Sequence, residues 1–363
     1  MPPARRPAFV PLAARGWAEL PLPADPPAAA PRRWPGVAVG RDRVLLAGDP
    51  PALARLSAAV GAVWPALARA LEDLPAPPPS SRAALRVGDW HLDLGVKTYV
   101  VAIVNRTPDS FSAGRSGLPT VPEVVGAARR AVRQGADLVD IGAESTAERE
   151  AGGLEPEREW ERLEPVLREL GDLPAVLSLD TRRGWVAERA LRIRHLVVND
   201  VDGLADPALA AVVARRRVPV VVMHPGPVAP DADVVAQVRV WAQTALKRAL
   251  DQGVSREQVI LDAGFGFGTT VEQDLQCTWR LGELAALGCP VLHAPSRKHA
   301  IGTVLAFPAA IAPRLPGTAA AVALGIAAGA DLVRVHDVRV MSRVARMVDA
   351  IVRGPSWRDV VAP

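Results

Sequence analysis

The chain has 363 residues, of which 49% are hydrophobic and only 4% aromatic, and its formal net charge is +4. This length allows one large domain and a smaller one, since a single α/β barrel needs about 250 residues. The basic residues are spread among acids and form no Lys/Arg stretch interleaved with aromatic residues, so we expect a solvated surface and not a face that binds nucleic acid.

The cysteines and the apolar runs bear on the cellular compartment. Cys277 and Cys289 are the only cysteines and neither lies in a CxxC pair, so we expect both to be reduced and structural. The N-terminal segment has no apolar run suited to a signal peptide, and no stretch reaches the ~20 apolar residues of a membrane span. These features predict a cytoplasmic protein with no membrane partner.

Composition divides the first part of the chain. Residues 1–35 are rich in Pro, Ala and Arg, which predicts a disordered or loosely docked arm. Residues 36–74 predict a small accessory α/β unit, with two short strands around Gly40 followed by a helix. The Pro-rich residues 75–84 predict an extended linker, and residues 85–363 form the second domain.

The second domain begins with a short alternating segment. Residues 86–94 alternate around Gly88-Asp89, a pattern typical of a β-hairpin. In front of a barrel, such a hairpin would close the bottom.

From Tyr99 onward, apolar strands alternate with amphipathic helical patterns. Each strand and helix together take roughly 30 residues, the size of a βα unit. Eight such units indicate an α/β fold of the (β/α)8 TIM barrel type. A doubly wound open sheet is the alternative, because periodicity does not show closure. The predicted strands are 99–105, 138–142, 175–180, 195–200, 219–224, 259–262, 290–294 and 332–336, and the clearest helices are 121–134, 156–170, 231–252 and 318–328.

Polar side chains follow these strands at the same relative place. Because the carboxyl ends of parallel strands meet at one face, we expect them to converge on the barrel mouth. Any one of them is equally well explained as a helix N-cap. As a group they favour a site, since unpaired carboxylates are costly there unless a ligand or cation completes them. The residues are Asn105, Glu144, Ser145, Thr146, Asp180, Asn199, Asp200, His224, Asp262, Ser296, Arg297, Lys298, Arg334 and His336.

Two further features of the mouth are unusual. Lys298 is one of three lysines among 43 basic residues, which suggests that a compact, strongly hydrated charge is needed there, although drift explains it equally well. The glycines of 264–268 (GFGFG) lack the Lys of a phosphate loop. We interpret them as allowing backbone to approach a flat ligand beside Phe265 or Phe267.

At these residues the chain resembles a known family. Eight segments are similar, in order, to the successive signatures of dihydropteroate synthases. The resemblance runs from about Leu85 to Ile351 and leaves the first 80 residues outside it. The segments are NRTPDSFS at 105–112, DIGAEST at 140–146, LDT at 179–181, NDV at 199–201, VMH at 222–224, LDAGFGFG at 261–268, SRK at 296–298 and RVHD at 334–337.

The resemblance implies a pterin-binding barrel that acts as a transferase. It would condense dihydropterin pyrophosphate with p-aminobenzoate to dihydropteroate, in folate biosynthesis. One group of residues would hydrogen-bond the edge of the dihydropterin or line its ring. This group consists of Asp180, Asn199, Asp262, Lys298, Met223 and Phe267.

A second group would hold the leaving pyrophosphate. Asn105, Arg334 and His336 belong to it, with Mg²⁺ bound at Asn105, and Thr146 would contact substrate from the second loop. We also expect a homodimer. The residues assigned to catalysis from both groups are Asn105, Asp180, Lys298, Arg334 and His336.

The sequence departs from the family pattern in its substrate loops. Ala113 replaces an acid in the first loop, and Ala147 replaces the Arg expected after Thr146. Thr269 stands where the family has Lys, and Arg106 where it has a small residue.

Two interpretations remain open. In one, the chain is a working synthase in which Arg106, Arg115 or Arg149 supplies the missing positive charge. In the other, it is a pterin-binding homologue with a ligand-binding or regulatory role. The pterin-binding module of a corrinoid methyltransferase fits less well, because that class lacks segments of the SRK and NRTPDSF type.

Overall fold

The computed structural model describes residues 84–108, 117–145, 148–149, 151–308, 310 and 312–353, and the backbone of four short strands before them. The chain divides into two compact units, residues 1–80 and residues 81–363. Each unit is described by itself.

The first unit contains a four-stranded antiparallel sheet in the order β1-β4-β3-β2, with β1 at Trp17–Pro21, β2 at Arg33–Trp34, β3 at Val37–Val39 and β4 at Arg43–Ala47. β3 and β4 are the two short strands expected around Gly40. β1 and β2 lie in the segment for which composition predicts an arm. Pairing with β4 and β3 satisfies their backbone groups, which composition does not reveal. The helix expected to follow lies outside the described residues.

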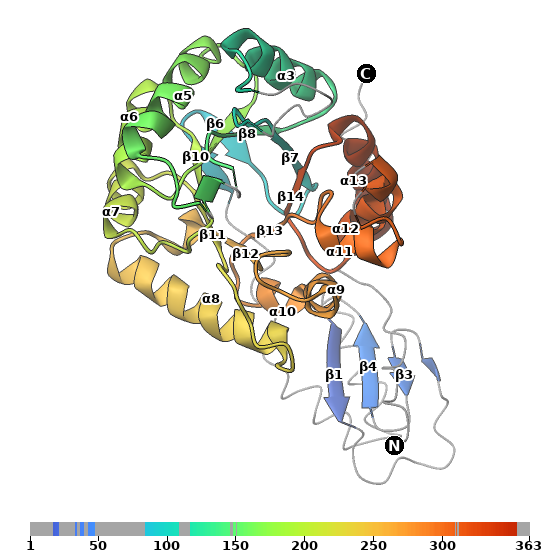
Figure 1. The fold of residues 1–363 in the computed structure, drawn as a ribbon. Helices are drawn as coiled ribbons and strands as arrows, with labels where there is room; N and C mark the ends of the chain where they lie inside the picture. Colours follow the sequence, from blue (N-terminus) through green and yellow to red (C-terminus); the bar gives the residue numbers. More distant parts are fainter. Residues whose placement is uncertain are drawn as a thin grey trace. The chain divides into compact units, whose positions relative to one another are not determined.

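The second unit is a closed parallel barrel (Figure 1), in the order β10-β11-β12-β13-β14-β7-β8-β9. Pairing of β14 with β7 closes it, which confirms the (β/α)8 barrel and excludes the open sheet. The eight predicted strands are all present, most of them shorter by one or two residues at their ends. They are β7 Tyr99–Ile103, β8 Leu138–Gly142, β9 Val176–Asp180, β10 Val197–Asp200, β11 Val220–Met223, β12 Val259–Asp262, β13 Val291–His293 and β14 Leu332–Val335.

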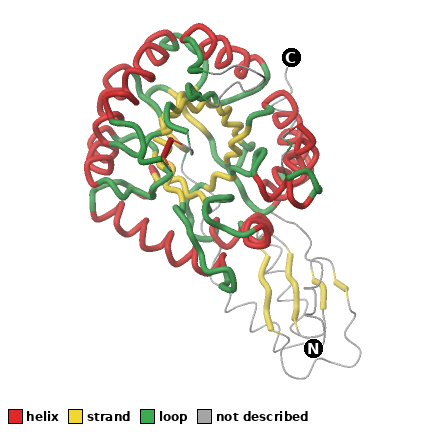
Figure 2. The backbone as a smooth tube through the Cα atoms, viewed as in Figure 1, coloured by secondary structure: helices red, strands yellow, loops and turns green. Residues whose placement is uncertain are grey.

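The helices form a ring outside the strands (Figure 2). They are α3 Val121–Arg133, α5 Pro156–Glu169, α6 Gly184–Ile193, α7 Pro207–Arg216, α8 Val234–Asp251, α9 Val271–Trp279, α10 Gly282–Ala285, α11 His299–Val304, α12 Leu315–Ala327 and α13 Val338–Val352. Within the part of the chain described here, no helix is both long enough and apolar enough to cross a membrane.

Local sequence explains where these helices begin and end, as α3 illustrates. Its N-cap Thr120 is bonded by Glu123, whose carboxylate accepts from the Thr120 backbone N–H at 2.9 Å. Val124 and Ala128 are fully buried against the strands, one turn apart. Gly135 follows the helix with φ of 102°, a left-handed conformation that favours glycine.

A hairpin closes the bottom of the barrel, as expected. β5 (Leu85–Val87) pairs with β6 (Trp90–Leu92), and Leu85 lies opposite Leu92 across the Gly88-Asp89 turn. The hairpin's inward side chains join an apolar layer inside the barrel. That layer contains Leu85, Val87, Leu92, Leu94, Tyr99, Val101, Leu138, Val176, Val197, Val221, Ile260, Leu292, Ala294 and Leu332.

We expect Leu85→Ala to lower the free energy of unfolding by about 2–4 kcal/mol, because it leaves a cavity in this layer. Leu85 is only 1% exposed. Urea denaturation of the variant checks this, with Val96→Ala as the control. Val96 is 47% exposed, and its truncation should cost less than about 0.5 kcal/mol. Equal losses in the two variants would argue against a sealing role for the hairpin.

Candidate active site

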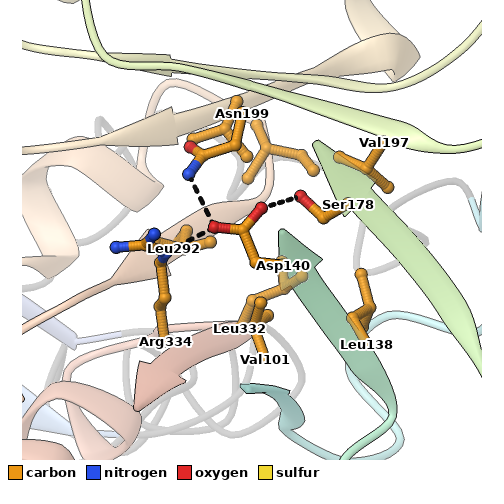
Figure 3. A pocket seen from close by; sticks show the side chains of 11 residues that line it. Val101, Leu138, Asp140, Ser178, Val197, Asn199, Leu292, Leu332 and Arg334 are labelled. Atoms are coloured by element: carbon orange, nitrogen blue, oxygen red, sulfur yellow. Dashed lines mark hydrogen bonds and ion pairs between the residues drawn. The ribbon is translucent and has the colours of Figure 1, made fainter. Parts of the chain in front are cut away.

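A network of charged and polar side chains lies inside the barrel, above the apolar layer (Figure 3). Asp140, the third residue of β8, is completely buried. Its carboxylate accepts from Ser178 Oγ at 2.5 Å, from Asn199 Nδ2 at 3.1 Å and from Arg334 Nε at 2.7 Å. Arg334 also donates from Nη2 to Asp180 Oδ2 at 2.8 Å. The network therefore ties four strands together: β8, β9, β10 and β14.

Strand register brings these residues together. Asp140 pairs with Ser178, and Asn199 pairs with Asp180, so three neighbouring strands present polar groups at nearly the same height. Arg334 approaches from β14, two strands from β8 on the far side of β7. Its long side chain spans that gap. The guanidinium donates from two different nitrogens to two carboxylates, whereas a Lys has a single nitrogen.

The network has an apolar floor. A cavity of about 10 Å³ beneath it is lined by Val101, Leu138, Val197, Leu292 and Leu332 together with the polar residues above (Figure 3). This volume accommodates at most one water molecule. The barrel interior is consequently packed at this level, with no room for a ligand beneath the network.

The charges of the network are unbalanced. Two carboxylates, Asp140 and Asp180, share the single guanidinium of Arg334. Burial raises the pKa of Asp180 to about 7; Asp140 adds to the rise, and Arg334 opposes it. A ligand edge that is positively charged or that donates hydrogen bonds is therefore favoured here.

A second group of site residues lies across β12 and β13. Asp262, at the end of β12, is 5% exposed and accepts from the Gly264 N–H at 2.8 Å. Lys298 Nζ donates to the Phe265 carbonyl and lies 4.4 Å from the centroid of the Phe267 ring. Burial lowers the pKa of Lys298 to about 8, against the opposing effect of Asp262. Met223 pairs with Asp262 in strand register and completes this side of the mouth.

The loops that carry these residues are packed together at glycines. A Cβ on Gly264 would lie 2.2 Å from the His224 carbonyl oxygen, and one on Gly226 would lie 2.0 Å from the Phe267 carbonyl oxygen. Both positions need glycine for close approach and for positive φ. His224 Nδ1 accepts from the Gly226 N–H at 3.0 Å, so this histidine shapes its own loop.

Asn105 and His336 lie on the side of the mouth near β7 and β14. The Oδ1 atom of Asn105 is buried and accepts no hydrogen bond from the described residues. Asn105 and Asp180 flank Gly142: a Cβ added to this glycine would lie 3.0 Å from Asn105 Oδ1 and 3.2 Å from Asp180 Cβ. Asn105 therefore reaches the edge of the network. His336 Nδ1 lies 3.1 Å from Ser296 Oγ, which accepts from the His336 backbone N–H.

The other strand-end residues have structural partners. Asp200 accepts from the backbone N–H groups of Asp202 and Leu204, at 2.9 and 2.5 Å, and so shapes the loop after β10. Arg297 makes two bonds to Asp337, at 2.9 and 2.6 Å. Neither side chain caps a helix, so the N-cap explanation does not apply to these two; Asp200 shapes a loop and Arg297 forms an ion pair.

The loop after β8 holds a charge cluster around Glu144, whose side chain is 5% exposed. Its carboxylate lies 2.9 Å from Arg183 Nη2, 3.3 Å from Arg182 Nε and 3.5 Å from Arg149 Nε. Ser145 accepts from the Glu148 N–H at 3.2 Å. Thr146 lies outside the described residues, so its predicted contact with substrate stays a prediction.

Asp140 and Ser178 were not predicted as site residues. A signal was present for Asp140: it is an acid within LVDIG, a strand otherwise suited to burial on both faces. A buried carboxylate needs partners, so a charge in such a strand indicates a polar network. Ser178 gave no comparable signal, because a single Ser is compatible with either face of a strand.

Comparisons with known proteins agree on one family. Residues 101–336 match the family model described as pterin binding enzyme. The chain is 37% identical over 291 residues to a dihydropteroate synthase of Synechocystis sp., a match that covers 78% of this chain and 96% of that protein. It is 37% identical over 257 residues to a dihydropteroate synthase of Bacillus subtilis, covering 70% and 89% of the two chains.

Solved structures give the same result. The dihydropteroate synthase of Xanthomonas albilineans with 4-aminobenzoic acid has a TM-score of 0.69 at 34% identity, over 77% of this chain and 99% of that one. The dihydropteroate synthase of Thermus thermophilus in complex with 6HMPPP has a TM-score of 0.65 at 37% identity, over 74% and 100% of the two chains.

We expect Asp140→Asn to lower the free energy of unfolding by about 3 kcal/mol, because it removes one partner of a buried ion pair. The matched control is Asp251→Asn. Asp251 pairs with Lys247 on the surface and its side chain is 61% exposed, so the change should cost about 0.5 kcal/mol or less. Denaturant titration distinguishes the two, and a loss for Asp140→Asn no larger than the control's would contradict a central role for this network.

Proposed function

The chain belongs to the dihydropteroate synthase family of pterin-binding enzymes, and we propose that it condenses a dihydropterin pyrophosphate with p-aminobenzoate to form dihydropteroate. The observation that carries this proposal is the set of acceptors and donors at the mouth. Carboxylates of Asp180 and Asp262, the amide of Asn199 and the ammonium of Lys298 lie at the ends of consecutive or nearby strands.

This set suits the edge of a pterin. The amino-pyrimidinone edge presents N–H donors, which carboxylates accept in charge-assisted hydrogen bonds. Lys298 supplies a donor for a ring acceptor, while Met223 and Phe267 offer apolar contact to the ring faces. Burial raises the pKa of Asp180 in the free protein. In this proposal a bound pterin lowers that pKa again, because its N–H donors stabilise the charged carboxylate.

The proposed reaction is a substitution at the methylene carbon of the dihydropterin. The bond from that carbon to the pyrophosphate oxygen breaks, the arylamine nitrogen forms a bond to the carbon, and the nitrogen then loses a proton. Departure of pyrophosphate leaves positive charge on the pterin methylene. The surplus negative charge of Asp140 and Asp180 lies where it would stabilise that charge, and the protein's contribution is positioning and electrostatics.

The leaving group needs positive charge and donors. We assign this role to Arg334 and His336, with Asn105 beside them. Burial and the positive charges of Arg297 and Arg334 lower the pKa of His336, so the ring is neutral at pH 7. Since Ser296 Oγ lies 3.1 Å from Nδ1, we assign the ring proton to Nε2, which is then the donor to the leaving group. Arg334 would share its guanidinium between pyrophosphate and the two carboxylates.

Mg²⁺ fits Asn105 as one ligand among several. The buried Oδ1 atom, which has no hydrogen-bond partner in the part of the chain that the structure describes, is a hard oxygen ligand. No group of three or more His, Cys, Asp or Glu able to hold a metal occurs among the described residues. Mg²⁺ is usually held by one or two protein oxygens with substrate phosphates and water, which matches a single Asn. When bound, it would neutralise charge on the departing pyrophosphate.

Of the two described arginines considered as replacements for the missing loop charge, Arg149 is better placed than Arg106. Arg106 is committed to backbone, with bonds to the carbonyls of Pro119 at 3.0 Å and Arg162 at 2.8 Å. Arg115 lies outside the described residues. Among the described residues, Arg149 makes long ion pairs, 3.5 Å to Glu144 and 3.6 Å to Asp202, and its side chain is 24% exposed.

A homodimer and a cytoplasmic location complete the proposal. Cys277 and Cys289 are both buried, which agrees with two structural thiols in a reducing compartment.

Removal of a pterin-contacting charge should weaken ligand binding. We expect Asp180→Ala and Lys298→Ala each to reduce the affinity for dihydropterin pyrophosphate by about tenfold or more, the effect of losing a charged hydrogen bond. Isothermal calorimetry measures it. Lys247→Ala, at a lysine that is 76% exposed, is the matched control. Unchanged affinity in both site variants would remove the pterin assignment.

A turnover assay tests the enzyme and the role of Arg149. With dihydropterin pyrophosphate and p-aminobenzoate, wild type should release pyrophosphate, and Arg149→Ala should lower kcat/KM by about 10²-fold, the effect of removing one positioned charge. Arg158→Ala, at a position 73% exposed, is the control. Addition of Ala147→Arg should restore activity to Arg149→Ala. Tight pterin binding without any wild-type turnover would instead favour the ligand-binding interpretation.

A further inference from the structure

One peptide group connects Lys298 to a buried acid outside the set of residues assigned to the site. The carbonyl of Phe265 accepts from Lys298 Nζ, and the N–H of the same peptide, at Gly266, donates to Asp274 Oδ1 at 2.7 Å. The peptide dipole therefore has its positive end toward the carboxylate and its negative end toward the ammonium. Each of the two hydrogen bonds polarises the peptide in the direction that strengthens the other.

Two hydrogen bonds fix the Asp274 carboxylate beside this peptide. Asp274 lies in the first turn of α9, is 3% exposed, and accepts a second bond from Thr269 Oγ1 at 2.6 Å. Its side chain has no ion-pair partner among the residues that the structure describes. A buried carboxylate bonded only to neutral donors is costly, and burial raises its pKa. The positive charge of Lys298 opposes this rise, and Asp274 in turn raises the pKa of Lys298, so each group favours the charged form of the other across the intervening peptide.

Lys298 in turn depends on the position of this peptide. A Cβ on Gly266 would lie 2.8 Å from Lys298 Cδ, so the lysine stem packs directly on the glycine backbone. The Phe267 ring lies beside the ammonium. A shift of the peptide would move the carbonyl acceptor and the ring together.

We propose that Asp274 is a positioning residue for Lys298: its carboxylate fixes the Phe265–Gly266 peptide, which holds the lysine ammonium charged and aimed at the ligand. The pterin as ligand rests on the proposed function, whereas the link between Asp274 and Lys298 does not. The charged and titratable groups that act on Lys298 are Asp262 and Arg334 besides Asp274, and Lys298 itself acts on His293 and His336. His299 faces Asp274.

The first test measures Lys298 without any ligand. Protein labelled with ¹³C at lysine Cε gives three signals, and Lys298→Arg identifies the one to follow through a pH titration. Asp274→Asn keeps an acceptor for the Gly266 N–H but removes the charge, so it should lower the pKa of Lys298 by about 1 unit, the low end of the effect of a nearby opposite charge. Thr269→Val keeps the charge and should shift it less. Asp251→Asn, on the surface, should leave it unchanged.

The second test separates positioning from folding. With the pKa of Lys298 lowered by about 1 unit, the affinity of Asp274→Asn for dihydropterin pyrophosphate should fall about fivefold at pH 8 and hardly at all at pH 6, where the lysine stays charged in both proteins. Asp274→Ala should also lose affinity at pH 6, because the Gly266 N–H then loses its shorter bond and keeps the longer one, to Thr269 Oγ1 at 3.2 Å. Equal losses at both pH values in Asp274→Asn, or an unchanged lysine titration, would overturn the proposal. Failure of pterin to bind wild type would instead reject the proposed function and leave the titration result valid.

Discussion

A buried arginine shared by two carboxylates is the interaction on which the site depends. Arg334 bonds to Asp140 and Asp180 inside a barrel whose floor is otherwise apolar. Each of these charges is too costly to bury alone, so the three side chains and Asn199 determine one another's positions. Strand order and register must both be correct for this to happen, since Arg334 reaches β8 across β7. Fold and site are therefore specified together.

The two halves of the mouth use different electrostatics. Around Asp180, two carboxylates share one guanidinium. This half of the mouth therefore favours a ligand edge that donates hydrogen bonds. Around Lys298, an ammonium lies among aromatic rings and carbonyls, with Asp262 nearby. A flat ligand with both donors and acceptors along its rim is complementary to this arrangement. Such complementarity supports recognition of a pterin better than any one residue does.

Most of the barrel and part of the site were predictable from sequence, for a physical reason. Strands buried on both faces appear as unbroken apolar runs, so their number was clear and their ends were in error by a residue or two. Residues at the carboxyl ends of strands, such as Asp180 and Asp262, were predicted because parallel strands converge there. Asp140 was missed because sequence does not show which side chain spans the barrel to meet it. Asp274 was missed because it bonds to a backbone N–H and a threonine hydroxyl, neither of which marks an acid partner in the sequence.

The glycine contacts between the loops after β11 and β12 have a consequence for how a ligand enters. Gly226 and Gly264 each place one loop's backbone against a carbonyl of the other, with no room for a side chain between them. The two loops can therefore shift only as one body. The surface that these two loops form is therefore preorganised, so little conformational entropy of the chain is lost when a flat ring binds against it.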